Sequence, residues 1–308
     1  MTLGTHTDID RQPPHLLLFA DTIRRLAFRS ALLLFSCAFT AALASAAEAP
    51  VPQLKPETRD AFARYVALTE ARNNAELPRG TDLLWVDSLP IAERDQAYAA
   101  LKRGEVQMKK LQTLEGGAAI RCSGGIVHHW VGLVFIPGAK LDDVLFILED
   151  YNHHSTYFAP DVEQSRIESR DGDHFRIFLR FRRHKVITVV LNTEHDVHYY
   201  RDAPSRAHSR SSAIRIAEVK NAGQKDEGEK PVGDDDGFLW GMETWWRMEE
   251  RDGGVYLQSE VASLTRDIPT GLGWMIGPFI TSIPQETLSA TLNAARKAVV
   301  ARVAAERR

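Results

Sequence analysis

Cysteine is scarce in this chain, with two residues among 308. Two thiols cannot build a disulfide scaffold or a four-cysteine zinc site, so the fold must depend on an apolar core. An excess of basic charge is also lacking, because 38 lysines and arginines stand against 41 aspartates and glutamates. Proteins that bind nucleic acid through its phosphates need such an excess, and no nucleic-acid partner is therefore expected.

Sequence motifs for nucleotide and ester chemistry are missing as well. The chain has no Gly-x-Gly-x-x-Gly or Walker pattern, and we expect no nucleotide and no other cofactor. It has no Gly-x-Ser-x-Gly elbow either, and the serines of residues 209–212 fall in a predicted strand, outside the context of a hydrolase nucleophile. What is present, 44% hydrophobic and 26% charged residues, is typical of a soluble globular protein.

Residues 1–47 have the pattern of an export signal. Three arginines between positions 24 and 29 precede an apolar run at 31–43, and small residues follow at 44–47. This order is typical of a secretory signal that is cleaved, which predicts a periplasmic or secreted protein. An uncleaved N-terminal membrane anchor is the alternative, although the apolar run is short for a span. Cleavage would leave Cys122 as the only thiol, and we expect it to be a small buried side chain.

Residues 48–104 are predicted to form a small N-terminal helical extension. The first helix, over residues 57–75, is predicted from apolar and small side chains at offsets of 0, 3, 4 and 7, namely Phe62, Tyr65, Val66 and Thr69. A second helix is predicted from near Pro90 to Gly104, and the apolar residues 83–86 between the two helices are expected to anchor them.

The remaining residues, 105–308, have the pattern of a single α+β domain. Apolar and arginine side chains alternate over residues 174–183, which predicts an antiparallel sheet with one dry face and one wet face. The charged stretch 220–237 is predicted to be a long solvated hairpin loop. Strands are expected over 105–114, 118–136, 162–171, 174–183, 186–201, 206–219, 238–249 and 255–267, with a short helix over 141–150. A long last helix is predicted from about Pro284, with an apolar stripe of Leu288, Leu292, Ala295, Val299 and Val303.

This order of elements implies a curved antiparallel sheet gripping the long C-terminal helix, because no other helix is long enough to cover the apolar face of the sheet. The order resembles the START-like helix-grip fold, also called the polyketide cyclase, SRPBCC or Bet v 1-like superfamily, over residues 105–305. Residues 245–256 look like the penultimate hairpin of exported bacterial members, and residues 264–274 look like the exit into the last helix. The resemblance implies a cavity for a hydrophobic small molecule, such as a lipid, a sterol or a polyketide-like compound. Most exported members have no assigned ligand.

Strand parity selects the candidate residues for binding such a ligand. Alternate residues of the penultimate strand should face the cavity together with two residues of the last helix. An apolar stripe of this kind is equally typical of plain core, although methionine also adapts to variable ligands. The candidates are Trp240, Met242, Thr244 and Trp246 of the strand and Leu288 and Leu292 of the helix.

The last strand leaves two alternatives open. The better candidates for the core face are Val255, Leu257, Ser259, Val261 and Ser263. Tyr256 and Glu260 would instead line a polar end of the cavity if a bulge shifted the parity of the strand. A buried Glu260 needs a cationic or hydrogen-bonding partner, and Arg215 or Arg247 could supply it.

The apolar connector Pro269–Ile283 is the most unusual segment, with Trp274 near its centre. One interpretation is a lid that packs over the edge of the sheet, since loops rarely expose a large apolar surface. The functional interpretation is a gate that opens to admit a lipid at a membrane surface, with Trp274 contacting the ligand. This second interpretation implies transient contact with a membrane.

Histidines are numerous, but we predict no metal site. Neighbouring histidines on a strand point to opposite faces, and the acidic run 234–236 is expected to be solvated. The pair His153 and His154 is placed at the mouth of the cavity, where it could contact a ligand headgroup.

The leading hypothesis is therefore an exported binding or carrier protein for a hydrophobic small molecule. An enzyme of cyclase, dehydratase or hydrolase type is the alternative, and it would need an acid or base pair in the cavity. Glu260, His195 and Tyr256 are the only candidates for such a pair, and none stands in a catalytic motif. A third hypothesis is an interaction module whose cavity is filled by its own side chains. The oligomeric state is left open.

Overall fold

The computed structural model describes residues 53–80, 83–184, 187–267 and 273–307, without the side chains of 273–281. All of them belong to the second of two units into which the chain divides, Pro52–Arg308. The predicted export signal at 1–47 lies outside the described residues.

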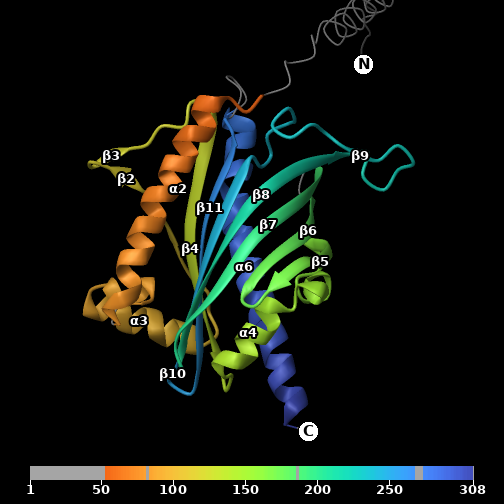
Figure 1. The fold of residues 1–308 in the computed structure, drawn as a ribbon. Coiled ribbons are helices and arrows are strands. Elements are labelled where there is room, and N and C mark those ends of the chain that lie inside the picture. The colour runs from red at the N-terminus through yellow and green to blue at the C-terminus, as the bar shows by residue number, and fades with distance from the viewer. Residues whose placement is uncertain (1–52, 81–82, 185–186, 268–272, 308) are drawn as a thin grey trace, which may run out of the picture. The chain divides into compact units, whose positions relative to one another are not determined.

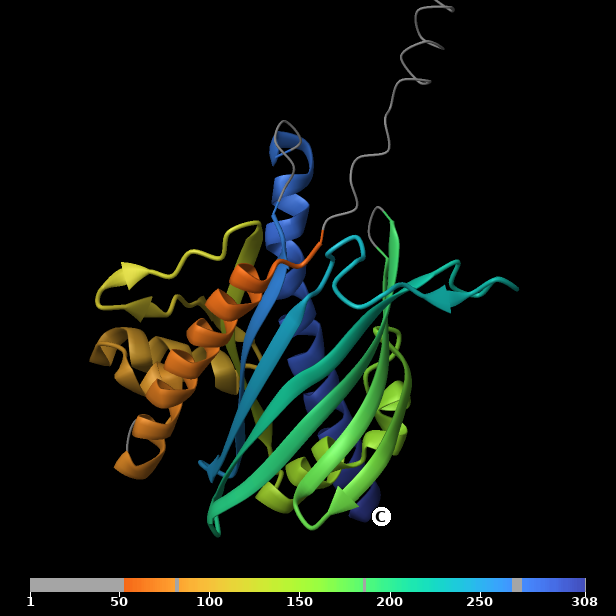
Figure 2. The same cartoon turned by 45° about the horizontal axis from the view of Figure 1, so that its top comes forward.

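The centre of this unit is one antiparallel sheet, which has nine strands within the described residues. Its order is β1-β4-β11-β10-β8-β7-β6-β5, with β9 paired to β8. Neighbours from β5 to β8 follow one another along the chain, and Figures 1 and 2 show the sheet curving around the last helix. The strands are β1 (Gln107–Lys110), β4 (Gly125–Pro137), β5 (Val162–Asp171), β6 (His174–His184), β7 (Thr188–Ala203), β8 (Arg206–Lys220), β9 (Gly228–Glu229), β10 (Gly241–Arg251) and β11 (Gly254–Arg266). A separate small hairpin consists of β2 (Leu114–Glu115) and β3 (Ala118–Ala119).

Helices pack on both sides of the sheet. The face toward the C-terminal helix is called the inner face below, and the opposite face the outer face. The long α6 and the short α4 cover the inner face, whereas α2 and α3 lie on the outer side of β4, β11 and β10 (Figure 1). The helical elements are α2 (Pro56–Glu76), η1 (Leu77–Arg79), η2 (Trp85–Ser88), α3 (Ile91–Lys102), α4 (Leu141–Glu149), η3 (Tyr151–His153), α5 (His154–Tyr157) and α6 (Gly273–Glu306). No described helix combines the length and the hydropathy needed to cross a membrane.

Each side of the sheet has its own apolar core. Leu288 and Leu292 of α6 are buried with Met248 and Leu257 in the inner core. On the outer side, Leu84 and Leu101 of the N-terminal segment pack on Tyr256, and Phe62 of α2 packs on Trp245 and Leu264. The strands β4, β11 and β10 are therefore covered on both faces.

Two glycines let the helices approach the sheet closely. A Cβ atom at Gly132 of β4 would lie 2.6 Å from Leu292 Cδ1, and one at Gly241 of β10 would lie 2.6 Å from Phe62 Cε1. Real Cβ atoms do not come so near another carbon, so any larger residue would push the helix away. Gly132 thus determines how closely α6 packs on the inner face, and Gly241 does the same for α2 on the outer face.

The predicted fold class is confirmed, since an antiparallel sheet, a long C-terminal helix and N-terminal helices are all present. The strands from β5 to β8 begin and end within two residues of the predicted limits. The predicted N-terminal helices correspond to α2 and α3, and the anchor Leu83, Leu84 and Val86 is buried between them. Cys122 is only half-buried.

Two expectations were wrong. The last helix begins at Gly273, not near Pro284, so most of the predicted connector at 269–283 is helical. Glycine and proline lower helix propensity, but local propensity is a weak constraint that the rest of the fold overrides. The charged stretch 220–237 is also not fully solvated, because it contains β9 and the buried Asp235. Asp235 accepts hydrogen bonds from the Gly237 N–H and the Trp240 indole N–H, which compensate its burial.

Candidate functional site

The inner face holds most of the predicted ligand-binding residues. Trp246 of β10 packs against the inner core, and Met242 and Thr244 share its side of the strand and are half-buried. Leu288 and Leu292 of α6 are almost completely buried opposite the sheet. Their predicted placement on this face is correct, and their contact with a ligand stays a prediction.

Three other predicted residues lie elsewhere. Trp240 precedes β10 and packs on the outer side near Phe62. Tyr256 and Glu260 of β11 also face outward, because β11 pairs with β4 and β10 without a register shift, and no bulge turns the strand. The first alternative for the last strand is therefore the correct one, and Val255, Leu257 and Val261 face inward. The side chain of Trp274 lies outside the described residues.

A row in which small residues alternate with aromatic ones crosses the middle of the inner face. Strand register places these residues side by side on β4, β11, β10, β8 and β7: Gly132, Ser259, Trp246, Ser209 and Tyr199. Ser209 and Ser259 flank Trp246, and each is only 1% exposed. Neither hydroxyl has a hydrogen-bond partner among the described residues. A buried hydroxyl without a partner costs about 1–3 kcal/mol of folding free energy, so each of the two hydroxyls would gain from a hydrogen bond to a further polar group.

The next row along the strands combines aromatic, apolar and hydroxyl side chains. Trp130, Val261, Thr244 and Ser211 lie side by side and are half-buried, although they share the inner face with the fully buried core. Ser211 and Thr193 contact the buried His195, at 3.4 Å and 2.9 Å from its two ring nitrogens. Burial lowers the pKa of His195 to about 4, so the ring is neutral at pH 7.

A second buried histidine, His128, lies at the same end of the inner face. Register places it beside Ser263 of β11, and its Nε2 is 3.1 Å from the Thr265 hydroxyl. Burial, with a smaller contribution from the charge of Lys110, lowers its pKa to about 4. The inner face thus carries neutral polar groups among its aromatic and apolar side chains.

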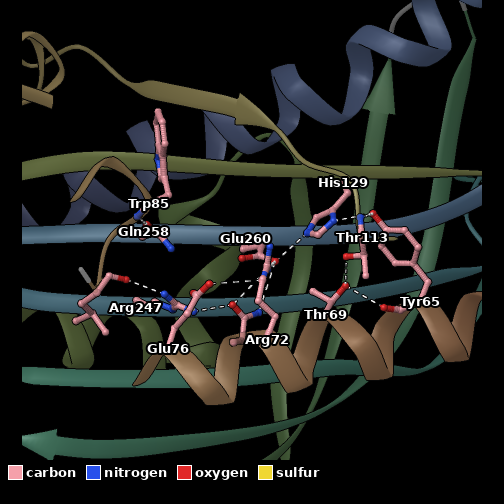
Figure 3. A network of polar contacts seen from close by, with 12 residues as sticks. Tyr65, Thr69, Arg72, Glu76, Trp85, Thr113, His129, Arg247, Gln258 and Glu260 are labelled. Carbon is pink, nitrogen blue, oxygen red and sulfur yellow. Dashed lines mark hydrogen bonds and ion pairs between the residues drawn. The ribbon is translucent and has the colours of Figure 1, made fainter. Parts of the chain in front are cut away.

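A second constellation, the polar network beneath α2, lies on the outer face (Figure 3). The Tyr65 hydroxyl accepts a hydrogen bond from the Thr113 N–H and donates one to His129 Nδ1, at 2.8 Å in each case. His129 Nε2 lies 2.8 Å from Glu260 Oε1, and Arg72 donates to the same oxygen. Because a carboxylate only accepts hydrogen bonds, His129 carries its proton on Nε2.

The network continues along α2 to its exposed end. Arg247 of β10 donates to Asn73 Oδ1 at 2.6 Å, to Glu76 Oε2 at 2.7 Å and to the Leu83 carbonyl at 2.7 Å. Gln258 of β11 accepts the Trp85 N–H at 2.7 Å. The three neighbouring strands β4, β11 and β10 are thereby each hydrogen-bonded to the N-terminal segment (Figure 3).

The charges in this network compensate each other. Burial alone would raise the pKa of the Glu260 carboxyl, but the hydrogen bond from His129 and the charges of Arg72 and Arg247 lower it overall. Burial raises the pKa of the Tyr65 hydroxyl, against the hydrogen bonds from Thr113. The charge of Arg247 therefore stabilises the ionised form of Glu260, as expected, whereas Arg215 pairs with Glu194 and Glu229 instead.

A tyrosine, a histidine and a glutamate in a hydrogen-bonded chain are able to relay a proton. Here Tyr65, His129 and Glu260 are each less than 5% exposed and lie under α2. We therefore interpret the network as the attachment of α2 to the sheet. The sequence offers one signal for it that was not used: Tyr65, Thr69, Arg72 and Glu76 are spaced by 4, 3 and 4, so they form one stripe of a helix.

Two concave regions are found on the outer side. One of about 690 Å³ lies between α3 and β1, and its lining includes Trp85 and Met108. The other, of about 630 Å³, lies beside α2 and the ends of β8 and β10, and its lining includes Phe62, Ile214 and Trp240. Neither is the space between the inner face and α6 where the ligand was expected.

The architecture that these elements define is a helix-grip fold, in which a curved antiparallel sheet encloses a long C-terminal helix. No family model matches the chain, and no curated protein matches its sequence.

Solved structures with a similar backbone include START-type proteins. A STAR-related lipid transfer protein from Xanthomonas axonopodis is 17% identical, with 61% of this chain and 98% of that one covered and a TM-score of 0.38. The Zhui aromatase/cyclase from Streptomyces sp. R1128 is 14% identical, with 59% and 97% covered and a TM-score of 0.36. The lipid transfer and protein localization domain of human StarD13 is 10% identical, with 68% and 98% covered and a TM-score of 0.37. Because these TM-scores are below 0.5, the likeness carries no argument about ligand or activity.

Proposed function

We propose that the chain is exported and that its mature form binds a hydrophobic small molecule bearing a polar group, held between the inner face of the sheet and α6. The observation that carries this proposal is the pair of buried, unpartnered hydroxyls of Ser209 and Ser259 on either side of Trp246. A polar group of a bound molecule on one side of Trp246 would satisfy the hydroxyl on that side, and the indole would contact the apolar part of the molecule.

The surroundings of the two serines support this ligand chemistry. Trp130, Met242 and Thr244 lie on the same face and stay half-buried. Methionine and tryptophan side chains on one face form an adaptable apolar wall, while hydroxyls on the same face orient a polar atom. The buried histidines of this face are neutral, so it favours an uncharged polar group such as a hydroxyl or a carbonyl over an anion.

The enzyme hypothesis has less support. Its three candidates do not converge, because Tyr256 and Glu260 face outward whereas His195 faces inward. His195 contacts the hydroxyls of Thr193 and Ser211, and among the described residues no carboxylate lies within hydrogen-bond distance of its ring. A neutral histidine that lacks an orienting acid is a weak general base.

The proposal is tested by mass spectrometry of the purified mature protein, first under native and then under denaturing conditions. We expect a co-purified molecule of low mass, or loading after incubation with a membrane extract. A protein that stays empty after this incubation would contradict the proposal and favour a core filled by its own side chains. N-terminal sequencing of the protein recovered from the periplasm or medium tests export separately.

Variants of one strand test the position of the ligand. Ser209→Ala removes a hydroxyl that has no protein partner, so folding should be unaffected while affinity for the co-purified molecule falls about tenfold, the equivalent of one hydrogen bond. Ser212→Ala is the matched control, because Ser212 lies three residues away on the outer face, where it contacts Glu243. If Ser209→Ala and Ser212→Ala bind the co-purified molecule with equal affinity, Ser209 does not contact it.

A further inference from the structure

A cluster of potential metal ligands lies on the outer face of the sheet, on the neighbouring strands β6 and β7 near the edge formed by β5. Strand register places His174 of β6 directly opposite His198 of β7, and Asp196 lies two residues before His198 on the same face. One side-chain atom from each of the three residues can be chosen so that all lie within 4.8 Å of one another. Within the described part of the chain, it is the only such group of three.

The contacts inside the cluster already converge on the carboxylate. His174 Nε2 lies 3.0 Å from Asp196 Oδ2, and His198 Nδ1 lies 3.4 Å from Oδ1. The two imidazole rings stack, with centroids 3.9 Å apart and an angle of 9° between their planes. His174 Nε2 is hydrogen-bonded to the carboxylate and therefore carries a proton, which must leave this nitrogen before the nitrogen can bind a metal ion.

We propose that His174, Asp196 and His198 bind one divalent transition-metal ion such as Zn²⁺. Two imidazole nitrogens and one carboxylate oxygen match the ligands that Zn²⁺ prefers, with three protein ligands and a fourth position for water. Ligand atoms about 2.1 Å from the ion lie about 3.4 Å apart in a tetrahedron. A metal ion lies in the plane of each imidazole that binds it, so the two stacked rings must turn out of their parallel arrangement, and their partly exposed side chains leave room for this rotation. The fourth position is open to solvent, because the two histidine side chains are 38% and 42% exposed.

The neighbouring charges leave the cluster available. Arg176 Nε is 3.7 Å from Asp196 Oδ2, longer than a hydrogen bond, and its side chain is half exposed. Arg210, opposite His198 on β8, instead pairs with Glu70 at 3.0 Å and Glu243 at 3.4 Å. Among the residues that the structure describes, only Arg176 therefore competes for the carboxylate, and its half-exposed side chain can turn toward water.

The ion would join β6 to β7 next to the hairpin turn at residues 171–173, where β6 begins. Binding to the folded state alone stabilises a protein by mass action: at a free ion concentration about 100 times the dissociation constant, the ratio of folded to unfolded chain rises about 100-fold. The inference does not depend on the ligand proposed for the inner face, which lies on the other side of the sheet.

The test is a Zn²⁺ titration of the untagged mature protein after treatment with a chelator, followed by competition with a chromogenic zinc indicator. We expect one ion per chain, and at least a tenfold weaker affinity for His174→Gln and for His198→Gln, since even indirect partners of a metal site cost 10- to 100-fold when removed. The Co²⁺ complex should show the visible absorption of a four-coordinate site, and this absorption should vanish in the double variant.

A matched control is His208→Gln. His208 pairs with Asp202 at 2.8 Å on the same face, but no second histidine joins that pair to complete a site. This variant should bind Zn²⁺ as the unmodified protein does. Zn²⁺ affinity that is unchanged in the His174→Gln/His198→Gln double variant would overturn the proposal, and so would an equal loss in His208→Gln. Circular dichroism of each variant shows whether a loss of binding comes from a loss of fold.

Discussion

The polar network beneath α2 permits a quantitative prediction for the variant Glu260→Ala. The Glu260 carboxylate accepts hydrogen bonds from His129 and Arg72, and a long one of 3.5 Å from Asn73. Removal of the carboxylate leaves His129, which is 1% exposed, with a buried N–H that has no acceptor. The Arg72 side chain is 38% exposed and can hydrogen-bond to water, so the loss of its ion pair with Glu260 should cost less stability than the loss of the bond to His129.

The magnitude follows from these contacts. A net hydrogen bond to a charged group is worth about 1.5–3 kcal/mol, and an unsatisfied buried donor costs about 1–3 kcal/mol. The free energy of unfolding should therefore fall by about 3–5 kcal/mol in Glu260→Ala, the range found when one member of a buried ion pair is removed. Glu260→Gln retains an acceptor for His129, and we expect about half of that loss.

Urea denaturation followed by circular dichroism measures both variants. Glu168→Ala is the control, because Glu168 forms an exposed pair with Arg166 and should cost less than about 1 kcal/mol. A loss below 1 kcal/mol for Glu260→Ala would refute the argument that the network attaches α2 to the sheet. Hydrogen exchange adds a local measurement, since the amides of α2 should lose protection before those of β6 and β7.

Three further predictions concern the inner face and its cover. Gly132→Ala should lower the free energy of unfolding by about 1–3 kcal/mol, because the added methyl group overlaps Leu292 Cδ1, and a urea titration measures this. The pKa values of His128 and His195 are about 4 in the folded state, against about 6.5 in the unfolded chain, so the unfolded chain takes up protons first. Stability should therefore fall as the pH drops from about 6.5 to 4, by ~3 kcal/mol for each histidine, and His195→Gln should reduce the slope in urea titrations at several pH values. Trp274→Asp should abolish loading with lipid while thermal unfolding stays unchanged if the gate interpretation holds, and a loss of folding would assign the residue to the core.

The alternation of side chains predicted β6 well, because the inner face of this strand is buried in the core and most of its outer face is not. Phe175 and Ile177 are buried as their positions in the strand required, and Arg176 between them is exposed. The predicted wet face is not uniform, because Phe178 and Arg180 are buried on it. The same parity placed Trp246 on the inner face. A strand's own sequence contains this information, since successive side chains point to opposite faces.

Contacts between distant segments were not accessible in this way. Glu260 is bonded to Arg72, which precedes it by 188 residues, and nothing near Glu260 in sequence indicates that partner. The approach of His174 to His198 was not accessible for the same reason: His195 and His198 lie on opposite faces of β7, but His198 meets His174 of the neighbouring strand β6. Only the register between strands brings such pairs together, and register depends on turns and packing rather than on one segment.

The unequal cover of the sheet has a mechanical consequence. Strands β4, β11 and β10 lie between α6 on one side and the N-terminal helices on the other, with Gly132 and Gly241 at the points of closest contact. Along β6 and β7 most outer side chains are at least partly exposed, and no helix lies over them in the described chain (Figure 2). Phe178 and Arg180 are the buried exceptions, covered by side chains of β5 and of the loop that contains Glu227. The strands that are covered on both faces should therefore resist bending more strongly than β6 and β7. Any widening between sheet and α6 costs least where β6 and β7 bend outward, and an ion held by His174 and His198 would stiffen these two strands.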